Sequence, residues 1–240
     1  MVAWLDSRDP TEPFPPADRA EAHLNGLLAM GGDLSLPRLL NAYRNGIFPW
    51  FNPGEPILWW SPDPRVILIP KRVHLSRSLR KCLRKQPFRI TLDHDFSGVI
   101  QSCAAPRPRS SGTWLVQEMI EAYIRLHRAG WAHSVEVWQG ETLVGGLYGV
   151  ALGRMFFGES MFSRVSNASK VALVALCQVL DAWGYGLIDC QVVNPHLLRM
   201  GAEQISRQRF LRALRILRAQ PAPRQHWKRE VAVSTTWLPS

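Results

Sequence analysis

The chain has 240 residues and a mass of 27.2 kDa, which allows one large domain or two unequal ones and excludes a longer multidomain assembly. Hydrophobic residues make up 46% of the chain and charged residues 20%, a composition typical of folded globular proteins and unlike that of disordered ones. Lysine and arginine outnumber aspartate and glutamate, so the formal net charge is +10 at pH 7.

The excess positive charge is concentrated in two stretches. Residues 65–89 carry nine basic side chains and no acidic one, and residues 199–229 carry nine basic side chains against Glu203 alone. Blocks of one charge are typical of proteins that bind an acidic polymer such as a nucleic acid, or an anionic membrane. The alternative interpretation is a solvated basic face without a partner.

Neither the N-terminus nor the cysteines indicate export. The first residues lack the basic start and apolar stretch of a signal peptide, and the longest apolar run, residues 171–177, is too short to span a membrane. The four cysteines have neither the density of a disulfide scaffold nor the spacing of a zinc site. We therefore expect a cytoplasmic protein that uses no metal.

The first 64 residues differ from the rest because they hold ten of the eighteen prolines, together with several large aromatic residues. One helix is well marked there: Ser35 suits the N-cap, Pro37 the first turn, and Gly46 the position after the last turn. We expect a small N-terminal domain over residues 1–64, built of loops around this helix. A second domain would occupy residues 65–240.

The second part of the chain shows mixed α and β patterns. We predict strands at 66–69, 88–92 and 187–191, a strand meander over 132–158, and helices at 75–86, 113–128 and 168–183, with two short helices ending near 218. This order predicts an α+β fold with a mostly antiparallel sheet. In the helix over 75–86, leucines share one face and basic residues the other.

The same order of elements occurs in the acetyltransferases that use coenzyme A. There, a glycine-containing turn before a helix binds the pyrophosphate through backbone amides. Residues 162–170 occupy that place and contain no glycine, which argues against coenzyme A. Arg164, Ser166, Ser169 and Lys170 could still bind a phosphate; an ordinary capped helix start is the alternative.

Two carboxylates occur in apolar sequence. Asp189 follows two large apolar residues in a predicted strand, and Gln191, two positions on, is expected on the same face. Glu159 lies between two apolar segments. A buried charge is costly without a partner or a function, so these acids either face an amine substrate or are hydrogen-bonded structural acids.

Seven segments form a distinctive series: residues 25–34 (NGLLAMGGDL), 46–51 (GIFPWF), 56–65 (PILWWSPDPR), 112–114 (GTW), 133–138 (HSVEVW), 157–163 (FGESMFS) and 187–191 (LIDCQ). Together they closely resemble the bacterial leucyl/phenylalanyl-tRNA–protein transferases, over about residues 14–210. The resemblance implies a small N-terminal domain followed by an acetyltransferase-like domain.

The resemblance also implies an activity. Such an enzyme moves Leu or Phe, and Met less well, from aminoacyl-tRNA to the N-terminal Arg or Lys of a protein, without the ribosome, and so marks that protein for degradation. The acidic partner would then be tRNA rather than DNA or a membrane. An aminoacyl ester is already activated, so we expect no metal or organic cofactor.

By the same resemblance, Asp189 orients Gln191 in a hydrogen-bond relay at the reacting amine and carbonyl, and Glu159 helps to hold an amino group. The sequence leaves open whether Asp189 is a base or only orients Gln191. The binding residues implied for the substrates are Trp50 and Trp114 around the terminal adenosine and aminoacyl end, Leu147, Phe156 and Leu176 around the donor side chain, and Ser163.

The resemblance and the charge pattern together assign the tRNA phosphates to the basic face of the helix over 75–86, formed by Arg77, Arg80, Lys81, Arg84 and Lys85. Two other functions remain compatible with the sequence. One is an acetyltransferase-like enzyme with another acyl donor, and the other is a non-catalytic RNA-binding module.

Overall fold

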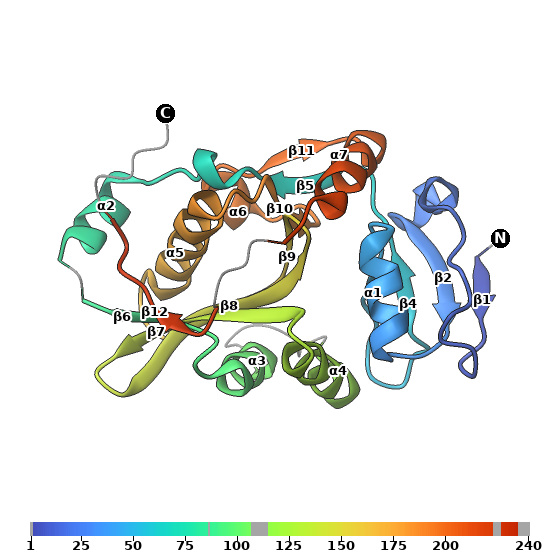
Figure 1. Ribbon diagram of the computed structural model, residues 1–240, viewed down its shortest axis with the longest axis horizontal. Helices are drawn as coiled ribbons and strands as arrows, with labels where there is room; N and C mark the ends of the chain where they lie inside the picture. The colour runs from blue at the N-terminus through green and yellow to red at the C-terminus, as the bar shows by residue number, and fades with distance from the viewer. Residues whose placement is uncertain (1, 86, 107–114, 223–226, 235–240) are drawn as a thin grey trace.

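The computed structural model describes residues 2–85, 87–106, 115–222 and 227–234. The chain forms a four-stranded sheet near the N-terminus and an eight-stranded sheet that carries most of the helices (Figure 1). Within these ranges, every helix is too short or too polar to cross a membrane.

The N-terminal sheet has the strand order β1-β2-β4-β3. Its elements are β1 (Ala3–Leu5), β2 (Leu27–Gly31), β3 (Phe48–Pro49) and β4 (Leu58–Trp60), with helix α1 (Leu36–Arg44) and the 3-10 turns η1 (Ala17–Arg19) and η2 (Ala22–Leu24). This sheet corrects the expectation of loops around one helix. Strands of two to five residues in proline-rich sequence are too short to show an alternating pattern.

Helix α1 begins and ends where the sequence predicts. The Ser35 side chain accepts a hydrogen bond from the backbone N–H of Arg38 at 3.4 Å, which satisfies one of the free amides of the first turn. Gly46, just beyond the end, has a φ of +72°, a conformation that glycine adopts without strain.

The larger sheet has the order β11-β5-β10-β9-β8-β7-β6-β12. The strands are β5 (Arg65–Leu68), β6 (Arg89–Leu92), β7 (Ala132–Gln139), β8 (Thr142–Leu152), β9 (Met155–Ser163), β10 (Leu187–Gln191), β11 (Glu203–Ile205) and β12 (Arg229–Glu230). β9 and β10 are parallel, whereas the other neighbours pair antiparallel, so the sheet is mixed.

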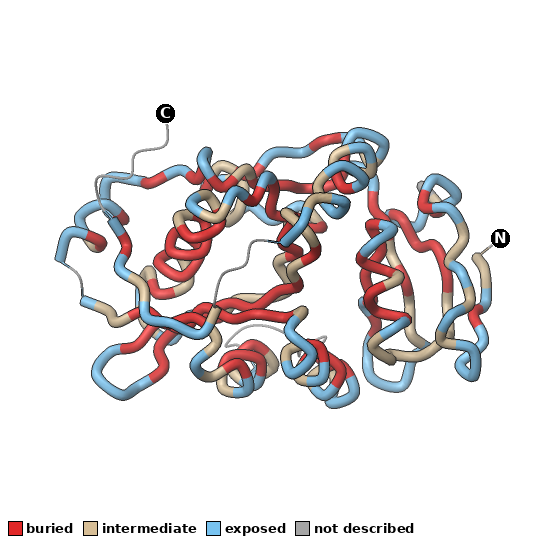
Figure 2. Tube along the Cα trace, in the orientation of Figure 1, coloured by how far each residue is buried: buried red, intermediate tan, exposed pale blue. Residues whose placement is uncertain are grey.

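Helices cover both faces of this sheet (Figure 1). They are α2 (Arg77–Arg84), α3 (Phe96–Ala104), α4 (Gln117–Arg128), α5 (Ala168–Ala182), α6 (Pro195–Arg199) and α7 (Arg207–Ala219), with the 3-10 turn η3 (Pro70–Arg72). α5 packs on one face of the sheet and is buried along most of its length (Figure 2). α3 and α4 pack on the other face, where the core continues into the N-terminal part through Tyr43 of α1 and Trp59 of β4.

The predicted helices and strands of the second part are found with boundaries shifted by a few residues. Among the described residues, the helix α3, the strands β11 and β12 and the 3-10 turn η3 were not predicted. Asp95 caps α3 by accepting from the backbone N–H of Gly98 at 2.9 Å, but a nine-residue helix that contains glycine and two serines gives a weak helical pattern. The start of the helix predicted over 113–128 lies partly outside the described residues.

β9 and β10 separate directly after their parallel pairing, which ends with Asp189 opposite Phe157. In β9, Glu159 is an extra residue between the two that pair with β8. In β10, Cys190 is an extra residue between the two that pair with β5. Such bulges redirect side chains and end strand pairing, so both strands change course at the same level of the sheet.

A close backbone approach accompanies the bulge in β9. A Cβ atom on Gly149 would lie 2.1 Å from the carbonyl oxygen of Phe157, whereas one on Gly158 would lie 3.5 Å from its nearest neighbour, the carbonyl oxygen of Asp189. We therefore expect Gly149→Ala to lower the free energy of unfolding by about 1–3 kcal/mol, the usual range for overpacking, and Gly158→Ala to change it much less. Urea unfolding of both variants checks this, and equal stabilities would contradict it.

Candidate active site

A buried ion pair lies where β9 and β10 separate. Arg65 in β5 and Asp189 in β10 are 1% and 0% exposed, and they are joined by two hydrogen bonds, Nε to Oδ1 at 2.8 Å and Nη2 to Oδ2 at 2.6 Å. The guanidinium also lies 4.9 Å from the ring centre of Phe48 and 4.4 Å from that of Phe210. Bidentate pairing between two aromatic rings fixes the orientation of the Asp189 carboxylate.

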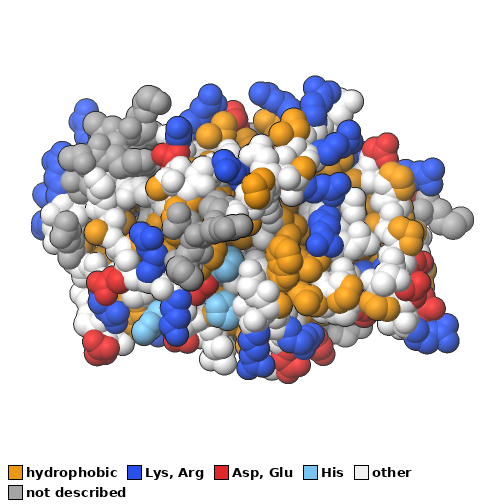
Figure 3. Space-filling view, viewed as in Figure 1, with side chains coloured by type: hydrophobic (Ala, Val, Ile, Leu, Met, Phe, Trp, Pro, Cys, Tyr) orange, Lys and Arg blue, Asp and Glu red, His pale blue; other side chains and the backbone are white. Residues whose placement is uncertain are grey.

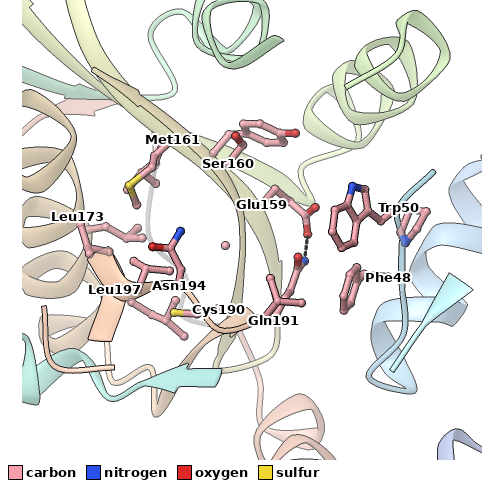
Figure 4. Close-up of a pocket in the computed structure, with 17 residues that line it drawn as sticks. Phe48, Trp50, Glu159, Ser160, Met161, Leu173, Cys190, Gln191, Asn194 and Leu197 are labelled. Atoms are coloured by element: carbon pink, nitrogen blue, oxygen red, sulfur yellow. Dashed lines mark hydrogen bonds between the residues drawn. The ribbon is translucent and has the colours of Figure 1, made fainter. Parts of the chain in front are cut away.

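Asp189 holds Gln191 through the backbone. The Gln191 N–H donates to Asp189 Oδ1 at 2.9 Å, and Gln191 has a φ of +63°, a conformation that costs free energy for a residue with a side chain. The strand alternation expected between these two residues is interrupted by the bulge at Cys190. As a result, the Gln191 side chain reaches Glu159, with Nε2 2.8 Å from Oε1 (Figure 4).

Glu159 is the centre of a hydrogen-bonded cluster. Besides Gln191, it accepts from the hydroxyl of Tyr43 in α1 at 2.8 Å and from that of Tyr123 in α4 at 2.9 Å. The two hydroxyl oxygens are themselves 2.5 Å apart. Sequence reasoning missed both tyrosines because each lies among the apolar positions of its helix, like an ordinary core residue.

Burial raises the pKa of Glu159 to about 7, although the hydrogen bonds from Tyr43, Tyr123 and Gln191 favour the ionised form, and the nearby charge of Asp189 adds to the rise. Burial also raises the pKa of both tyrosines well above the ordinary value, so they remain neutral donors. At neutral pH the Glu159 carboxyl is therefore divided between its protonated and ionised forms.

A cavity of about 240 Å³ opens beside this cluster (Figure 4). Phe48 and Trp50 lie on one side of it, next to Glu159 and Gln191, and Met161, Leu173 and Leu197 lie on the other. Further apolar walls are Pro49, Leu147, Leu176, Ile188 and Val192, and the polar groups include Ser160 and Asn194. The cavity therefore places an apolar compartment next to groups that hydrogen-bond or carry charge.

The structure brings most of the predicted site residues together. Trp50, Leu147 and Leu176 line the cavity with Glu159 and Gln191, and Asp189 lies beneath them. Trp114 lies outside the described residues, as does the rest of the segment 112–114.

Two of the predicted binding residues do not line this cavity. Phe156 is fully buried in the core between the sheet and α5, because it precedes the bulge and still follows the regular alternation of β9. Ser163 is exposed; its hydroxyl donates to the carbonyl oxygen of Val165 at 2.8 Å and accepts from the N–H of Ser169 at 3.2 Å. Asn167 occupies the N-cap position of α5 but makes no side-chain capping bond, so Ser163 satisfies a free amide of the first turn in its place.

The alternative phosphate site at the start of α5 is largely engaged within the protein. Arg164 donates to the Leu143 carbonyl oxygen at 3.2 Å and to the Ser102 hydroxyl at 3.1 Å, and Lys170 Nζ lies 3.3 Å from Asn167 Oδ1. Among the described residues, no group of His, Cys, Asp and Glu side chains is arranged to hold a metal ion.

Helix α2 has the amphipathic character that the sequence predicts. Leu79 and Leu83 are buried, and Ser76 caps the helix by accepting from the N–H of Leu79 at 3.2 Å. The exposed basic side chains are Arg77, Arg80, Lys81, Arg84 and Lys85. In the part of the chain that the structure describes, none of these five forms an ion pair, so their charges are available to an acidic partner.

The raised pKa of Glu159 makes stability depend on pH. Between pH 4.5, the ordinary value, and about 7, the folded state keeps a proton that the unfolded chain has lost, so stability falls as the pH rises through this window. Glu159→Gln cannot ionise. We therefore expect its stability relative to the parent to increase by on the order of 1 kcal/mol for each pH unit within this window. Urea unfolding at pH 5 and pH 7.5 checks this, with the exposed Glu118→Gln as control; a difference that does not vary with pH would contradict it.

Comparisons with known proteins agree on one family. The family model described as leucyl/phenylalanyl-tRNA protein transferase matches residues 67–215, and the model of the N-terminal domain of that family matches residues 32–63. The leucyl/phenylalanyl-tRNA–protein transferase of Nitrosomonas europaea is 58% identical over 215 residues, which cover 90% of this chain and 91% of that protein. That of Cellvibrio japonicus is 53% identical over 238 residues, covering 99% and 100%.

The chain is also distantly similar to the solved structure of L-PGS from Bacillus licheniformis. The TM-score is 0.39 and the sequence identity 10%, and the match covers 68% of this chain and 55% of that one. The family models and the close relatives confirm the resemblance seen in the sequence. The chain belongs to the leucyl/phenylalanyl-tRNA protein transferase family and is an aminoacyltransferase.

Proposed function

We propose that the protein transfers Leu or Phe, and Met less well, from aminoacyl-tRNA to the N-terminal Arg or Lys of other proteins in the cytoplasm, and so marks them for degradation. The observation that carries this proposal is the apolar cavity directly beside Glu159 and Gln191. An apolar donor side chain in that cavity would hold its ester next to groups that bind an amine. The names of the close relatives support Leu and Phe as donors.

The cavity is suited to the aminoacyl end of the donor. Its apolar walls would bury Leu, Phe or Met, whereas a charged side chain would lose its hydration without gaining a partner. At the mouth, the Trp50 side chain is 41% exposed, and Trp60 holds the chain there by donating from Nε1 to the Trp50 carbonyl oxygen at 2.6 Å. An exposed indole on an anchored segment, directly after β3, offers a stacking surface to the terminal adenosine.

The polar cluster is suited to the acceptor amine. Glu159, with a pKa of about 7, titrates close to an α-amino group, whose ordinary pKa is roughly 7.7–8.0. Its carboxylate can hold the ammonium form and accept its proton, which leaves the neutral amine that reacts. The amine nitrogen then bonds to the ester carbonyl carbon, and collapse of the tetrahedral intermediate breaks the bond to the ribose oxygen, which leaves with a proton.

Gln191 and Asp189 have different parts in this reaction. The Gln191 side-chain amide borders the cavity and can donate to the developing oxyanion. Both oxygens of Asp189 are engaged by Arg65, and one of them also holds the Gln191 N–H. Asp189 is therefore a positioning residue in our proposal, rather than the base.

For the rest of the chain, we propose that the exposed basic face of α2 contacts tRNA phosphates. We also propose a division into an N-terminal domain over residues 1–64 and an acetyltransferase-like domain over 65–240. The change from one sheet to the other between β4 and β5 supports this boundary.

A transfer assay tests the proposed function. The protein is incubated with Leu-tRNA and a peptide that begins with Arg, and separately with acetyl-CoA and the same peptide. We expect a product heavier by one leucine in the first reaction and no product in the second. Acetyl transfer, or tRNA binding without any product, would instead support one of the two alternative functions.

The roles of Asp189 and Gln191 predict a specific kinetic effect. We expect Asp189→Asn and Gln191→Ala each to lower kcat by about 100-fold, the scale of removing one oxyanion hydrogen bond, while tRNA affinity stays close to that of the parent. Because the two residues act as a unit, the double variant should be little worse than the poorer single variant. Defects that multiply would show separate roles, and unchanged kcat in both single variants would remove these residues from the reaction.

We expect the cavity walls to determine donor choice. Leu176→Phe reduces the space, so the rate of Phe transfer relative to Leu transfer should fall by about tenfold, within the range of one altered apolar wall. Phe156→Leu is the matched control, since Phe156 is buried but does not line the cavity. Competition between Leu-tRNA and Phe-tRNA measures the ratio; a larger change in the control than in Leu176→Phe would place the donor pocket elsewhere.

A further inference from the structure

A second basic surface lies where α7 meets the N-terminal part of the chain. A wide groove of about 860 Å³ there, which we call the α7 groove, contains the side chains of Arg44, Arg207, Arg212, Arg215 and Arg218. Its acidic residues are Asp18 and Asp63. Figure 3 shows Lys and Arg side chains gathered over α7, away from those at the α2 end of the molecule.

Most of these arginines lack an acidic partner. Arg44, Arg212, Arg215 and Arg218 are exposed and form no ion pair within the described ranges. Elsewhere, exposed arginines such as Arg8 do pair, in that case with Asp6 at 3.1 Å. Like charges three positions apart destabilise a helix, so the row at 212, 215 and 218 favours the binding of an anion that would offset the repulsion.

Two residues of the groove are held by contacts to the N-terminal part. Arg207 donates to the Ser61 carbonyl oxygen at 2.6 Å, and its backbone N–H donates to Asp63 at 3.0 Å. Arg218 donates to the Arg44 carbonyl oxygen. These contacts fix α7 against the N-terminal part, so the row of arginines between them is presented by a rigid frame.

The groove and the active site are joined through shared structural elements, although no residue lines both. On the buried side of α7, Phe210 packs against Arg65, and Gly46 lies so close that a Cβ there would be 2.9 Å from the Phe210 ring. The chain that leaves the groove at Arg44 reaches the cavity at Trp50. Six residues of extended chain span at most about 20 Å, so the groove lies within a few nucleotides of the cavity mouth.

We propose that the α7 groove binds phosphates of the tRNA nucleotides that precede the terminal adenosine at Trp50. This inference rests on the proposed function. All five basic residues of α7 are arginines, and the planar guanidinium matches two phosphate oxygens at once, which the lysine ammonium does not. α2 and α7 lie on opposite sides of the ends of β9 and β10, so the two surfaces contact different stretches of the tRNA backbone (Figure 1).

The first test measures tRNA affinity as a function of salt for the double variant Arg212→Ala/Arg215→Ala. We expect the Kd at low salt to rise about tenfold and the slope of log K against log salt to fall by roughly 0.7–0.9 for each phosphate that is no longer bound. The matched control is Arg125→Ala/Arg128→Ala, which removes two exposed arginines of α4 without touching the groove. The control should retain the affinity and slope of the parent.

A second donor separates the groove from the catalytic site. Leucine esterified to adenosine alone carries no phosphate, so the Arg212→Ala/Arg215→Ala variant should use it as fast as the parent. A slower reaction with this small donor would show that the substitutions disturb the cavity, and would overturn the phosphate assignment.

The remaining outcomes distinguish failure of the groove from failure of the function. If the parent transfers leucine but the double variant binds tRNA with the same affinity and slope, only the groove proposal is wrong. A raised KM for acidic acceptor proteins with unchanged tRNA affinity would assign the groove to the acceptor, and would also overturn it. If the parent transfers no leucine from tRNA, the proposed function fails, and this inference fails with it.

Discussion

The ion pair between Arg65 and Asp189 is the interaction on which the geometry of the site depends. Removing two charges from water costs several kcal/mol for each ion, and good pairing with additional hydrogen bonds is needed to offset that cost. Here both guanidinium–carboxylate bonds are short, the Gln191 N–H adds a third bond, and Phe48 and Phe210 flank the guanidinium. The pair therefore connects the central sheet with the N-terminal sheet and with α7.

The second constraint is the separation of β9 and β10. Bulges at Glu159 and Cys190 end the parallel pairing, and the space that opens is bordered by side chains rather than filled by another strand. One bulge turns Glu159 toward Tyr43 and Tyr123, and the other turns Gln191 toward Glu159. A single carboxylate thus links α1, α4, β9 and β10, which ties the position of the N-terminal part to the position of the reacting groups.

The sequence predicted the features that depend on local chemistry. Ser35 marked the start of α1, the leucine spacing indicated the buried face of α2, and two carboxylates in apolar surroundings pointed to Asp189 and Glu159. It did not predict the features that depend on distant contacts. Tyr43 and Tyr123 are 80 positions apart and meet only in the fold.

The positions of Phe156 and Gln191 both depend on the bulges in β9 and β10. Alternation along a strand predicts which face a side chain occupies until a bulge shifts the register. Glycine within a strand can indicate a bulge, and Gly158 lies beside the one in β9, but β10 contains no glycine. Phe156 precedes the bulge and stays in the core, whereas Gln191 follows one and takes a φ of +63°. The strands of the N-terminal sheet were missed because pairing with distant residues, rather than their own pattern, makes them strands.

A double-mutant cycle on the ion pair tests the central claim most directly. The free energy of unfolding is measured for the parent, Arg65→Ala, Asp189→Ala and the double variant. Each single variant leaves a buried charge without its partner and should lose about 3–5 kcal/mol, whereas the double variant should lose at least about 2 kcal/mol less than the two losses added together. Losses that simply add would show that the two residues act independently, and would contradict the central role of the pair.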